Sequence, residues 1–317
     1  MARLPPPLQS RVERAARAYF EAPGMAHVDF TTPKGAPALF APDSVSWRVM
    51  KNPVSLMIGG IAAVLLELAE PRVRTGVWEH TSFRRDPVTR MKRTGLAAMV
   101  TIYAPAEQAR AMIAGVVRAH ERVEGVTPAG VAYRANDEEL LTWVQATAGY
   151  GFFEAYNRFV RPLSQAELDR SYAEGSETAA LYGALNAPKN ETEMRALFDT
   201  MRPKLERSDI IFDFLRIVRD APILPSRSMQ RLMIRGAVEM TPNWAREILS
   251  LDASYGLKPG GETLLRTLGA AADHLVLESA PPAQACVRMG LPASYLYEAP
   301  ASFNKTSAKA CGRVFIT

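Results

Sequence analysis

The hydrophobic and polar positions of this chain follow a helical period along most of its length. Apolar residues recur three and four positions apart in one segment after another, which is the spacing of one helix face. Prolines separate these segments, because proline cannot continue a helix. No alternating run is long enough to need a sheet, and no internal repeat is visible. The pattern therefore predicts an all-α fold, built as a single large helical domain.

Most of the predicted helices begin at a recognisable start signal. Asp86 precedes a proline, which is expected at the first helical position. Ser164 with Glu167, and Asn136 with Glu139, have the spacing of capping boxes. We expect helices within residues 5–22, at 54–68, from 87, from 105, at 136–160, from 164, and at 190–205, 209–219, 226–238, 242–251 and 262–275. Connections are expected at 23–46, 72–86 and 126–135, with a short extended piece at 131–133, and no clear pattern is visible after residue 280.

The helix predicted over residues 54–68 is apolar on nearly all sides, and such a helix is buried. It contains Gly59 and Gly60, although each glycine inside a helix costs about 1 kcal/mol relative to alanine. Glycine lets another group approach the backbone closely. We therefore expect either a second helix or a flat ligand to lie against this pair.

Length and composition are those of an ordinary globular protein. The chain has 317 residues, of which 48% are hydrophobic and 22% charged, and this argues against a disordered chain. The net charge of +5 is spread along the sequence rather than gathered in one basic patch, which argues against nucleic-acid binding. The H-E-x-x-H metal motif, the glycine-rich nucleotide loops and the G-x-S-x-G nucleophile motif do not occur.

The sequence has no strong signal for secretion or for a membrane span. Its two cysteines, Cys286 and Cys311, form neither a Cys-x-x-Cys motif nor a disulfide framework. Residues 1–9 lack the apolar core of a signal peptide. The longest uncharged apolar run, residues 54–66, is shorter than the about 20 residues that a bilayer requires. These observations favour a cytoplasmic protein without a transmembrane segment.

Residues 90–125 contain the most informative candidate chemistry. An Ala-Pro pair divides the segment into two helices. On the first helix Arg90, Arg93 and Thr94 are spaced i, i+3 and i+4, so they share one face. On the second helix an apolar stripe at helical period includes His120. An inward imidazole opposite a cationic and hydroxyl-bearing face suits a pocket for a metal macrocycle.

These motifs resemble those of a known oxygenase family. R-x-x-R-T at residues 90–94, followed by H-x-x-V-x-G at 120–125, is similar to the motif pair of the latex-clearing rubber oxygenases and the fungal MpaB oxygenase. Further motifs extend the resemblance over residues 45–250: W-R-V at 47–49, G-V-W-E-H-T at 76–81, W-V-Q-A-T at 143–147 and F-V-R-P-L at 159–163. The resemblance implies a globin-like haem-binding core with additional helices.

His120 occupies the family's histidine position, and the resemblance implies that it is the axial ligand of a haem b iron. An imidazole on a rigid helix gives iron one fixed bond and leaves the opposite side open for dioxygen. Its second ring nitrogen is then expected to donate to a carbonyl or a carboxylate. The residue pattern alone instead favours a core histidine whose ring is satisfied by a backbone carbonyl.

Arg90, Arg93 and Thr94 match the family's R-x-x-K-T group, with arginine in place of the lysine. The resemblance implies a catalytic role for them near the open side of the haem, where a cation and a hydroxyl would stabilise negative charge on oxygen. A guanidinium also pairs bidentately with carboxylates, so Arg90 is a candidate for binding a haem propionate as well. The residue pattern alone equally allows a solvated, basic helix start.

Several positions depart from the family or have no clear role. Gln145 stands where the family has a histidine after Trp-Val, and glutamine cannot titrate or serve as a usual iron ligand. Glu79 and His80 are expected near the same site by family order, either as an acid or base or as a surface pair. His27 and His274 have no supporting motif and are interpreted as structural.

The sequence supports three hypotheses of function. The first is a haem-dependent oxygenase that uses dioxygen on a hydrophobic small-molecule substrate, with isoprenoid-like compounds as candidates. The second is a non-catalytic protein that binds haem or a hydrophobic ligand on the same scaffold, and the third is a structural protein with a filled core beside His120. We expect residues 1–46 to form an N-terminal helix and irregular connection, residues 47–280 an oxygenase-like helical domain, and residues 281–317 a C-terminal extension.

Overall fold

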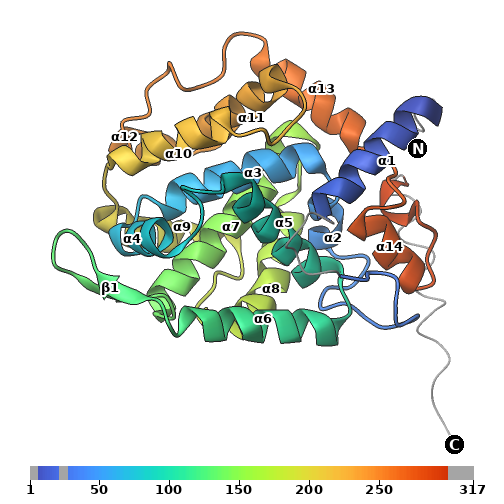
Figure 1. The fold of residues 1–317 in the computed structure, drawn as a ribbon, viewed down its shortest axis with the longest axis horizontal. Helices are drawn as coiled ribbons and strands as arrows, with labels where there is room; N and C mark the ends of the chain where they lie inside the picture. The colour runs from blue at the N-terminus through green and yellow to red at the C-terminus, as the bar shows by residue number, and fades with distance from the viewer. Residues whose placement is uncertain (1–5, 21–27, 299–317) are drawn as a thin grey trace, which may run out of the picture.

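The computed structural model describes residues 6–20 and 28–298. Within these ranges the chain consists of α-helices, one small hairpin and their connections (Figure 1). The prediction of an all-α single domain is confirmed. His27 and Cys311 lie outside the described residues.

The elements follow one another along the chain in a simple order. The helices are α1 (Pro6–Phe20), α2 (Val45–Met50), α3 (Pro53–Glu67), α4 (Pro71–His80), α5 (Pro87–Tyr103), α6 (Ala106–His120), α7 (Glu138–Phe159), α8 (Gln165–Leu181), α9 (Glu191–Met201), α10 (Asp209–Asp220), α11 (Arg227–Met240), α12 (Asn243–Ile248), α13 (Gly261–Asp273) and α14 (Pro281–Arg288). Strands β1 (Glu124–Val126) and β2 (Ala132–Arg134) form an antiparallel hairpin between α6 and α7.

Helices α3 and α7 form the centre of the molecule and lie side by side (Figure 1). At one point a Cβ on Gly59 would lie 2.5 Å from the Gly151 carbonyl oxygen. At another point the Trp143 indole donates to the Leu66 carbonyl at 3.2 Å, so the two helices run antiparallel. Of the two alternatives that the glycine pair left open, the structure has a helix against Gly59.

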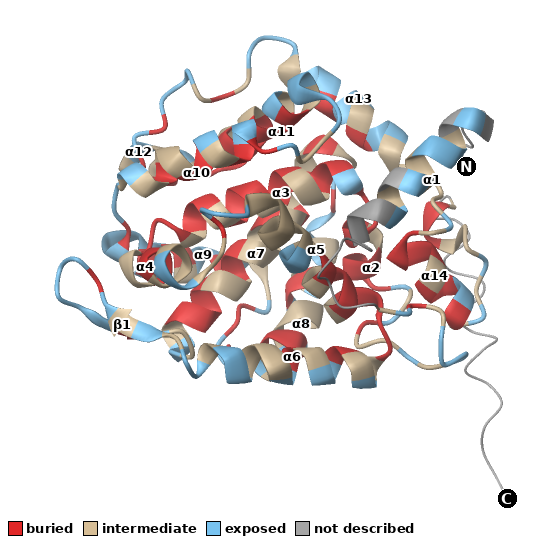
Figure 2. Ribbon diagram, viewed as in Figure 1, coloured by how far each residue is buried: buried red, intermediate tan, exposed pale blue. Residues whose placement is uncertain are grey.

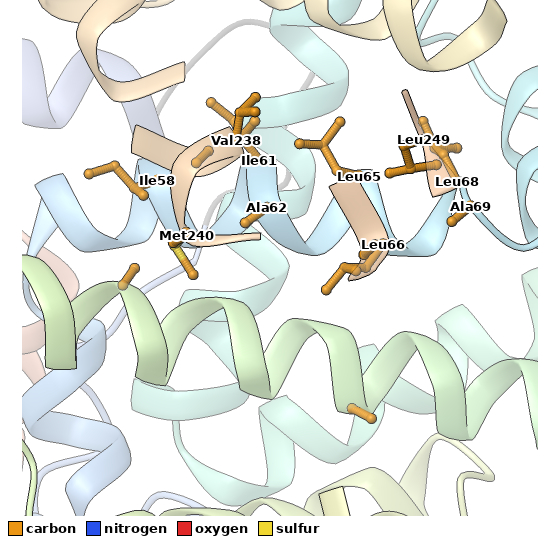
Figure 3. Packing of buried hydrophobic residues seen from close by; sticks show 14 of the residues in the cluster. Ile58, Ile61, Ala62, Leu65, Leu66, Leu68, Ala69, Val238, Met240 and Leu249 are labelled. Atoms are coloured by element: carbon orange, nitrogen blue, oxygen red, sulfur yellow. The ribbon is translucent and has the colours of Figure 1, made fainter. Parts of the chain in front are cut away.

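The main hydrophobic core surrounds α3. Side chains of α7, α10 and α11 and of the segment after α12 meet it in one cluster of buried residues. Figure 3 shows Ile61 and Leu65 of α3 in this cluster together with Val238 of α11 and with Leu249. In Figure 2 α3 and α7 are largely buried, whereas α6 lies at the edge and is mostly exposed or half-buried.

A second, smaller core lies around the end of α5. Trp47 Nε1 donates to the Ile102 carbonyl at 3.0 Å, and the Tyr103 hydroxyl donates to the Trp47 carbonyl at 2.7 Å. The same cluster includes Phe40 from the N-terminal connection and Cys286 from α14. The three segments expected from the sequence, 1–46, 47–280 and 281–317, therefore all contribute to this core. The boundaries between them remain a prediction.

Three short elements lie where the sequence pattern predicted none. The connection expected over residues 72–86 is wrong for its first part, because Glu70 caps α4 by accepting from the Val73 N–H at 2.8 Å. One Glu-Pro pair therefore ends α3 and starts α4, with Pro71 in the first turn. Similarly, Ser44 caps the short helix α2. Helix α14 starts with two prolines in the unpatterned tail, where sequence periodicity is weak.

Candidate functional site

Helices α5 and α6 pack against each other and carry most of the candidate residues (Figure 1). Helix α5 starts at the predicted N-cap, where the Asp86 carboxylate accepts from the Thr89 N–H at 3.2 Å. The Ala-Pro pair separates the two helices as predicted, with Pro105 as the N-cap residue of α6. Helix α6 ends at His120, so the candidate ligand occupies the last helical position before the hairpin.

His120 is half-buried, and its Nδ1 atom is buried without a hydrogen-bond partner. Burial lowers the pKa of His120 and the positive charge of Arg90 lowers it further, whereas the side chain of Asn136 raises it. The net effect favours the neutral imidazole, which is the form that ligates a metal. Buried polar atoms without partners are uncommon in folded proteins, so this nitrogen points to a functional role.

Asn136 lies beside His120 and does not cap α7. The capping box predicted at this position is wrong, because the N-cap of α7 is Asp137, which accepts from the Leu140 N–H at 3.2 Å. A carboxylate one residue later suits the positive end of the helix dipole better than an amide does. The Asn136 side chain instead donates through Nδ2 to the Val117 carbonyl at 3.2 Å, and its Oδ1 is buried without a partner.

Arg90 connects the candidate residues of α5 with His120. It donates through Nη1 to Thr94 Oγ1, and the Thr94 hydroxyl donates to the Arg90 carbonyl at 3.0 Å. Burial lowers the pKa of Arg90, while the charge of Glu67 raises it and that of Arg93 lowers it. Arg90 is half-buried, whereas Arg93 and Thr94 are exposed. The structure thus brings Arg90, Thr94 and His120 together and leaves Arg93 on the solvent side.

Glu67, the last residue of α3, belongs to the same group of charges, and the sequence interpretation missed it. Burial raises the pKa of Glu67 to about 7, although the nearby Arg90 lowers it. A carboxyl group with this pKa exchanges its proton near neutral pH. One signal was available in the sequence, since Glu67 is the first charged residue after the uncharged run at 54–66. Charged residues are rarely buried, so a single acid at the end of a buried helix is an informative exception to that rule.

The second half of α6 presents an apolar surface that the core does not cover. Val116 and Val117 are half-buried, and neither is among the described residues that pack on the two main core clusters. The buried residues of α6 are confined to its first half, at Ala109 and Ile113. This apolar surface continues up to His120, so a flat hydrophobic group beside the imidazole would contact it.

The donor set suits a haem better than a bare metal ion. Within residues 6–20 and 28–298, no group of three or more His, Cys, Asp or Glu side chains is arranged to hold a metal ion. A haem iron needs only one protein imidazole, because the porphyrin supplies the other nitrogens. The single imidazole of His120 fits that requirement, and the adjacent cation of Arg90 and the apolar surface at Val116 and Val117 suit the propionates and the flat face of a porphyrin.

The structure contains an open cavity of about 450 Å³, but at a different place. It lies between α1 and residues 276–284 and is lined by Gln9, Glu13 and Ser279 among others. None of the predicted site residues lines it. This cavity therefore does not correspond to the site at His120, where the candidate residues lie on half-exposed faces of α5 and α6.

The remaining candidates from the sequence lie at other positions. Gln145 is half-buried on α7, two residues after Trp143, and so about 200° around the helix from the side chain that faces α3. Glu79 and His80 are exposed at the end of α4, and the His80 Nε2 lies 3.2 Å from the Tyr133 hydroxyl of β2. His274 is exposed at the C-cap of α13. The structure thus pairs His80 with the hairpin and gives His274 no ligand-binding environment.

Fold and site together define an all-α domain with a half-buried histidine beside a cationic helix and an apolar surface. The chain belongs to the family of ER-bound oxygenase mpaB/B′ and rubber oxygenase catalytic domains, whose model matches residues 47–274. This range runs from α2 to the residue after α13 and includes every candidate site residue. Membership supports an oxygenase function in general, with dioxygen and a small-molecule substrate. A search of curated proteins finds no match, and a search of solved structures finds none either.

Among the helices that the structure describes, no single one is both long enough and apolar enough to cross a bilayer. Helices α3 and α4 pass the same criteria when taken together, but they are bent by 112° at the break between them.

Proposed function

We propose that this protein is a haem-dependent oxygenase that acts on a hydrophobic small molecule, with His120 as the axial ligand of haem b. The observation that carries this proposal is the half-buried imidazole of His120 at the end of α6, beside the guanidinium of Arg90 and the apolar surface at Val116 and Val117. Its position matches the histidine motif within the family's oxygenase domain. Bound haem would supply the redox chemistry that activates dioxygen.

Arg90 is the side chain best placed to bind or stabilise a negative charge in this site. Its guanidinium is half-buried, close to His120, and held by Thr94. Two roles fit this geometry, namely pairing with a haem propionate and stabilising negative charge that develops on oxygen. In both roles the Thr94 hydroxyl restricts the guanidinium to one orientation.

Glu67 and the apolar surface of α6 would act on the substrate, Glu67 by exchanging a proton and the apolar surface by binding it. The pKa of Glu67 is about 7, so its carboxyl group holds a proton below neutral pH and releases it above. Glu67 can therefore accept or donate one proton during turnover. Val116 and Val117 would exclude water from a hydrophobic substrate and bind its apolar surface. These contacts favour an unsaturated, isoprenoid-like substrate class, as the rubber oxygenase name of the family also suggests.

An absorption spectrum of the purified protein tests this proposal. Protein produced with added haem is expected to show a Soret band, and His120→Ala is expected to remove or strongly shift it. The matched control is His274→Ala, since His274 is exposed at the end of α13 and its loss should leave the band unchanged. A wild-type protein that binds no haem would contradict the proposal, as would an unaltered band in His120→Ala.

A non-catalytic protein that binds haem or another hydrophobic ligand is the second candidate function. Two observations favour it, namely Gln145 at the position of the family's histidine and the exposure of Arg93. Oxygen consumption distinguishes the two candidates. A haem-loaded protein that consumes oxygen with hydrophobic alkenes or terpenoids is an oxygenase, whereas a normal haem spectrum without consumption for any of them favours binding alone.

A further inference from the structure

Two side chains at the end of α6 each have one buried polar atom without a partner. These atoms are Nδ1 of His120 and Oδ1 of Asn136. Asn136 lies against α6 beside His120, because its amide donates to the carbonyl of Val117, three positions before His120 on that helix. Since buried atoms of this kind are nearly always paired, two of them on adjacent side chains call for one explanation.

Asn136 is held in place from both its backbone and its side chain. The preceding residue, Ala135, donates its N–H to the Val123 carbonyl at 2.8 Å, and the Val123 N–H donates to the His120 carbonyl at 2.9 Å. The Asn136 side chain donates to the Val117 carbonyl at 3.2 Å. Val117 precedes His120 by three positions, so both lie on the same face of α6. These bonds hold the amide of Asn136 on the face that carries the imidazole.

The orientation of the Asn136 amide follows from its partner. A carbonyl only accepts hydrogen bonds, so the amide nitrogen must point to Val117 and the amide oxygen must be the free atom. The Val117 carbonyl also accepts from the Glu121 N–H at 3.2 Å, and both of its lone pairs are then used. Asn136 Oδ1 is therefore the available acceptor beside the His120 ring.

We propose that Asn136 is a positioning residue whose Oδ1 accepts a hydrogen bond from Nδ1–H of His120, and so holds the ring in the tautomer with a free Nε2 for the haem iron. A neutral imidazole has one donor and one acceptor nitrogen, and a partner on one nitrogen decides which is which. Ligating histidines usually donate their other nitrogen in this way, which orients the ring and raises its basicity. The inference rests on the proposed haem site.

The experiment compares haem-loaded wild-type protein with Asn136→Ala and Asn136→Asp. The matched control is Asn186→Ala, because Asn186 is exposed and its amide bonds to the Glu138 carboxylate, away from α6. The readouts are haem affinity by titration, the reduction potential, and the iron–histidine stretching frequency of the ferrous protein. Circular dichroism checks that each variant is folded.

Asn136→Ala is expected to weaken haem binding by about 10–100-fold, which is the usual effect of losing such a partner. Its reduction potential should rise and its iron–histidine frequency should fall, because the ligand becomes less basic. Asn136→Asp should shift both quantities in the opposite direction, since a carboxylate is the stronger acceptor, and Asn186→Ala should match the wild type. Asn136→Asp decides the question if the alanine variant does not fold.

Two negative results have different meanings. A wild-type protein that binds haem through His120, combined with Asn136 variants that match it in affinity, potential and frequency, overturns the role of Asn136 and leaves the proposed function intact. A wild-type protein that binds no haem at all overturns the proposed function itself, and the positioning role with it.

Discussion

Glu67 and Arg90 lie close enough for each to shift the pKa of the other, although they belong to helices that are separate in sequence. Burial acts on both groups against the charged form. For Glu67 burial outweighs the attraction of Arg90, and the pKa rises from its ordinary value of 4.5 to about 7. Arg90 in turn lowers the pKa of His120, so it connects the carboxyl group of Glu67 with the imidazole.

The raised pKa of Glu67 predicts a pH-dependent stability. Between about pH 4.5 and 7 the folded state binds more protons than the unfolded state, so stability falls as the pH rises through this window. Glu67→Gln removes this dependence. Relative to that variant, the free energy of unfolding of the haem-free wild type should fall by about 1–3 kcal/mol between pH 4.5 and 7.5. Urea unfolding at both pH values measures the difference, and equal pH dependence in the two proteins would refute the assignment.

The contact between α3 and α7 predicts that Gly59 does not tolerate a side chain. In Gly59→Ala the new Cβ would lie 2.5 Å from the Gly151 carbonyl oxygen, which is a backbone atom, so one of the two helices would have to shift. We expect a loss of at least about 1–3 kcal/mol, which is typical of overpacking. Thermal unfolding measures it, with about 1–2 °C expected for each kcal/mol in a chain of this size.

Gly60→Ala is the matched control for this prediction. A Cβ at Gly60 would meet nothing closer than the Phe152 ring at 3.8 Å, which is ordinary contact. Alanine also forms helices better than glycine, by about 1 kcal/mol. Gly60→Ala should therefore leave the melting temperature unchanged or raise it. Equal destabilisation by both substitutions would show that the close approach at Gly59 is not the cause.

Replacing Arg288 is expected to lower the stability of the fold strongly, although Arg288 lies outside the candidate site. Its side chain is 1% exposed and donates to the carbonyls of Ala36 at 3.0 Å, Phe30 at 2.8 Å and Tyr103 at 2.7 Å. These bonds connect α14 with the N-terminal connection and with the end of α5. Arg288→Met leaves the buried carbonyls of Phe30 and Tyr103 and the partly buried carbonyl of Ala36 without this donor, and each buried group without a partner costs about 1–3 kcal/mol. A loss of at least about 3 kcal/mol in the free energy of unfolding is expected by denaturant titration.

The control for Arg288 is the same substitution at Arg266. Arg266 is 59% exposed and forms an ion pair with Glu262 at 3.0 Å, one turn away on α13. Exposed pairs of this type contribute only about 0–1 kcal/mol. If Arg266→Met destabilised the protein as much as Arg288→Met, the loss would come from removing an arginine in general and not from the three carbonyls.

Local signals in the sequence predicted much of the helical fold. Ser164 and Glu167 form both bonds of the expected capping box, because those bonds depend only on residues within one turn. The same kind of signal failed at Asn136, where the neighbouring Asp137 caps the helix instead. It also failed at Glu70, which was expected to end one helix and in fact also starts the next. Where two adjacent residues can serve the same local role, the sequence does not decide between them.

The candidate site shows a different limit to sequence interpretation. Arg90, Arg93 and Thr94 were equivalent by their spacing, yet only Arg90 of the three is half-buried, because the packing of other helices against α5 determines which side is covered. Glu67 enters the site from a helix that carries no motif. These relationships are tertiary, so helical periodicity could identify the faces but not their neighbours.

The difference in burial between Arg90 and Arg93 leads to a prediction about haem binding. Arg90→Met removes a half-buried cation close to His120, and losing a hydrogen bond to a charged group costs about 1.5–3 kcal/mol, or at least about tenfold in affinity. Arg93→Met removes an exposed charge, for which less than about fivefold is expected. Haem titration of both variants measures the affinities. Equal losses would contradict the special role of Arg90, whereas unchanged affinity with lost oxygen consumption would assign Arg90 to the oxygen side of the haem and not to a propionate.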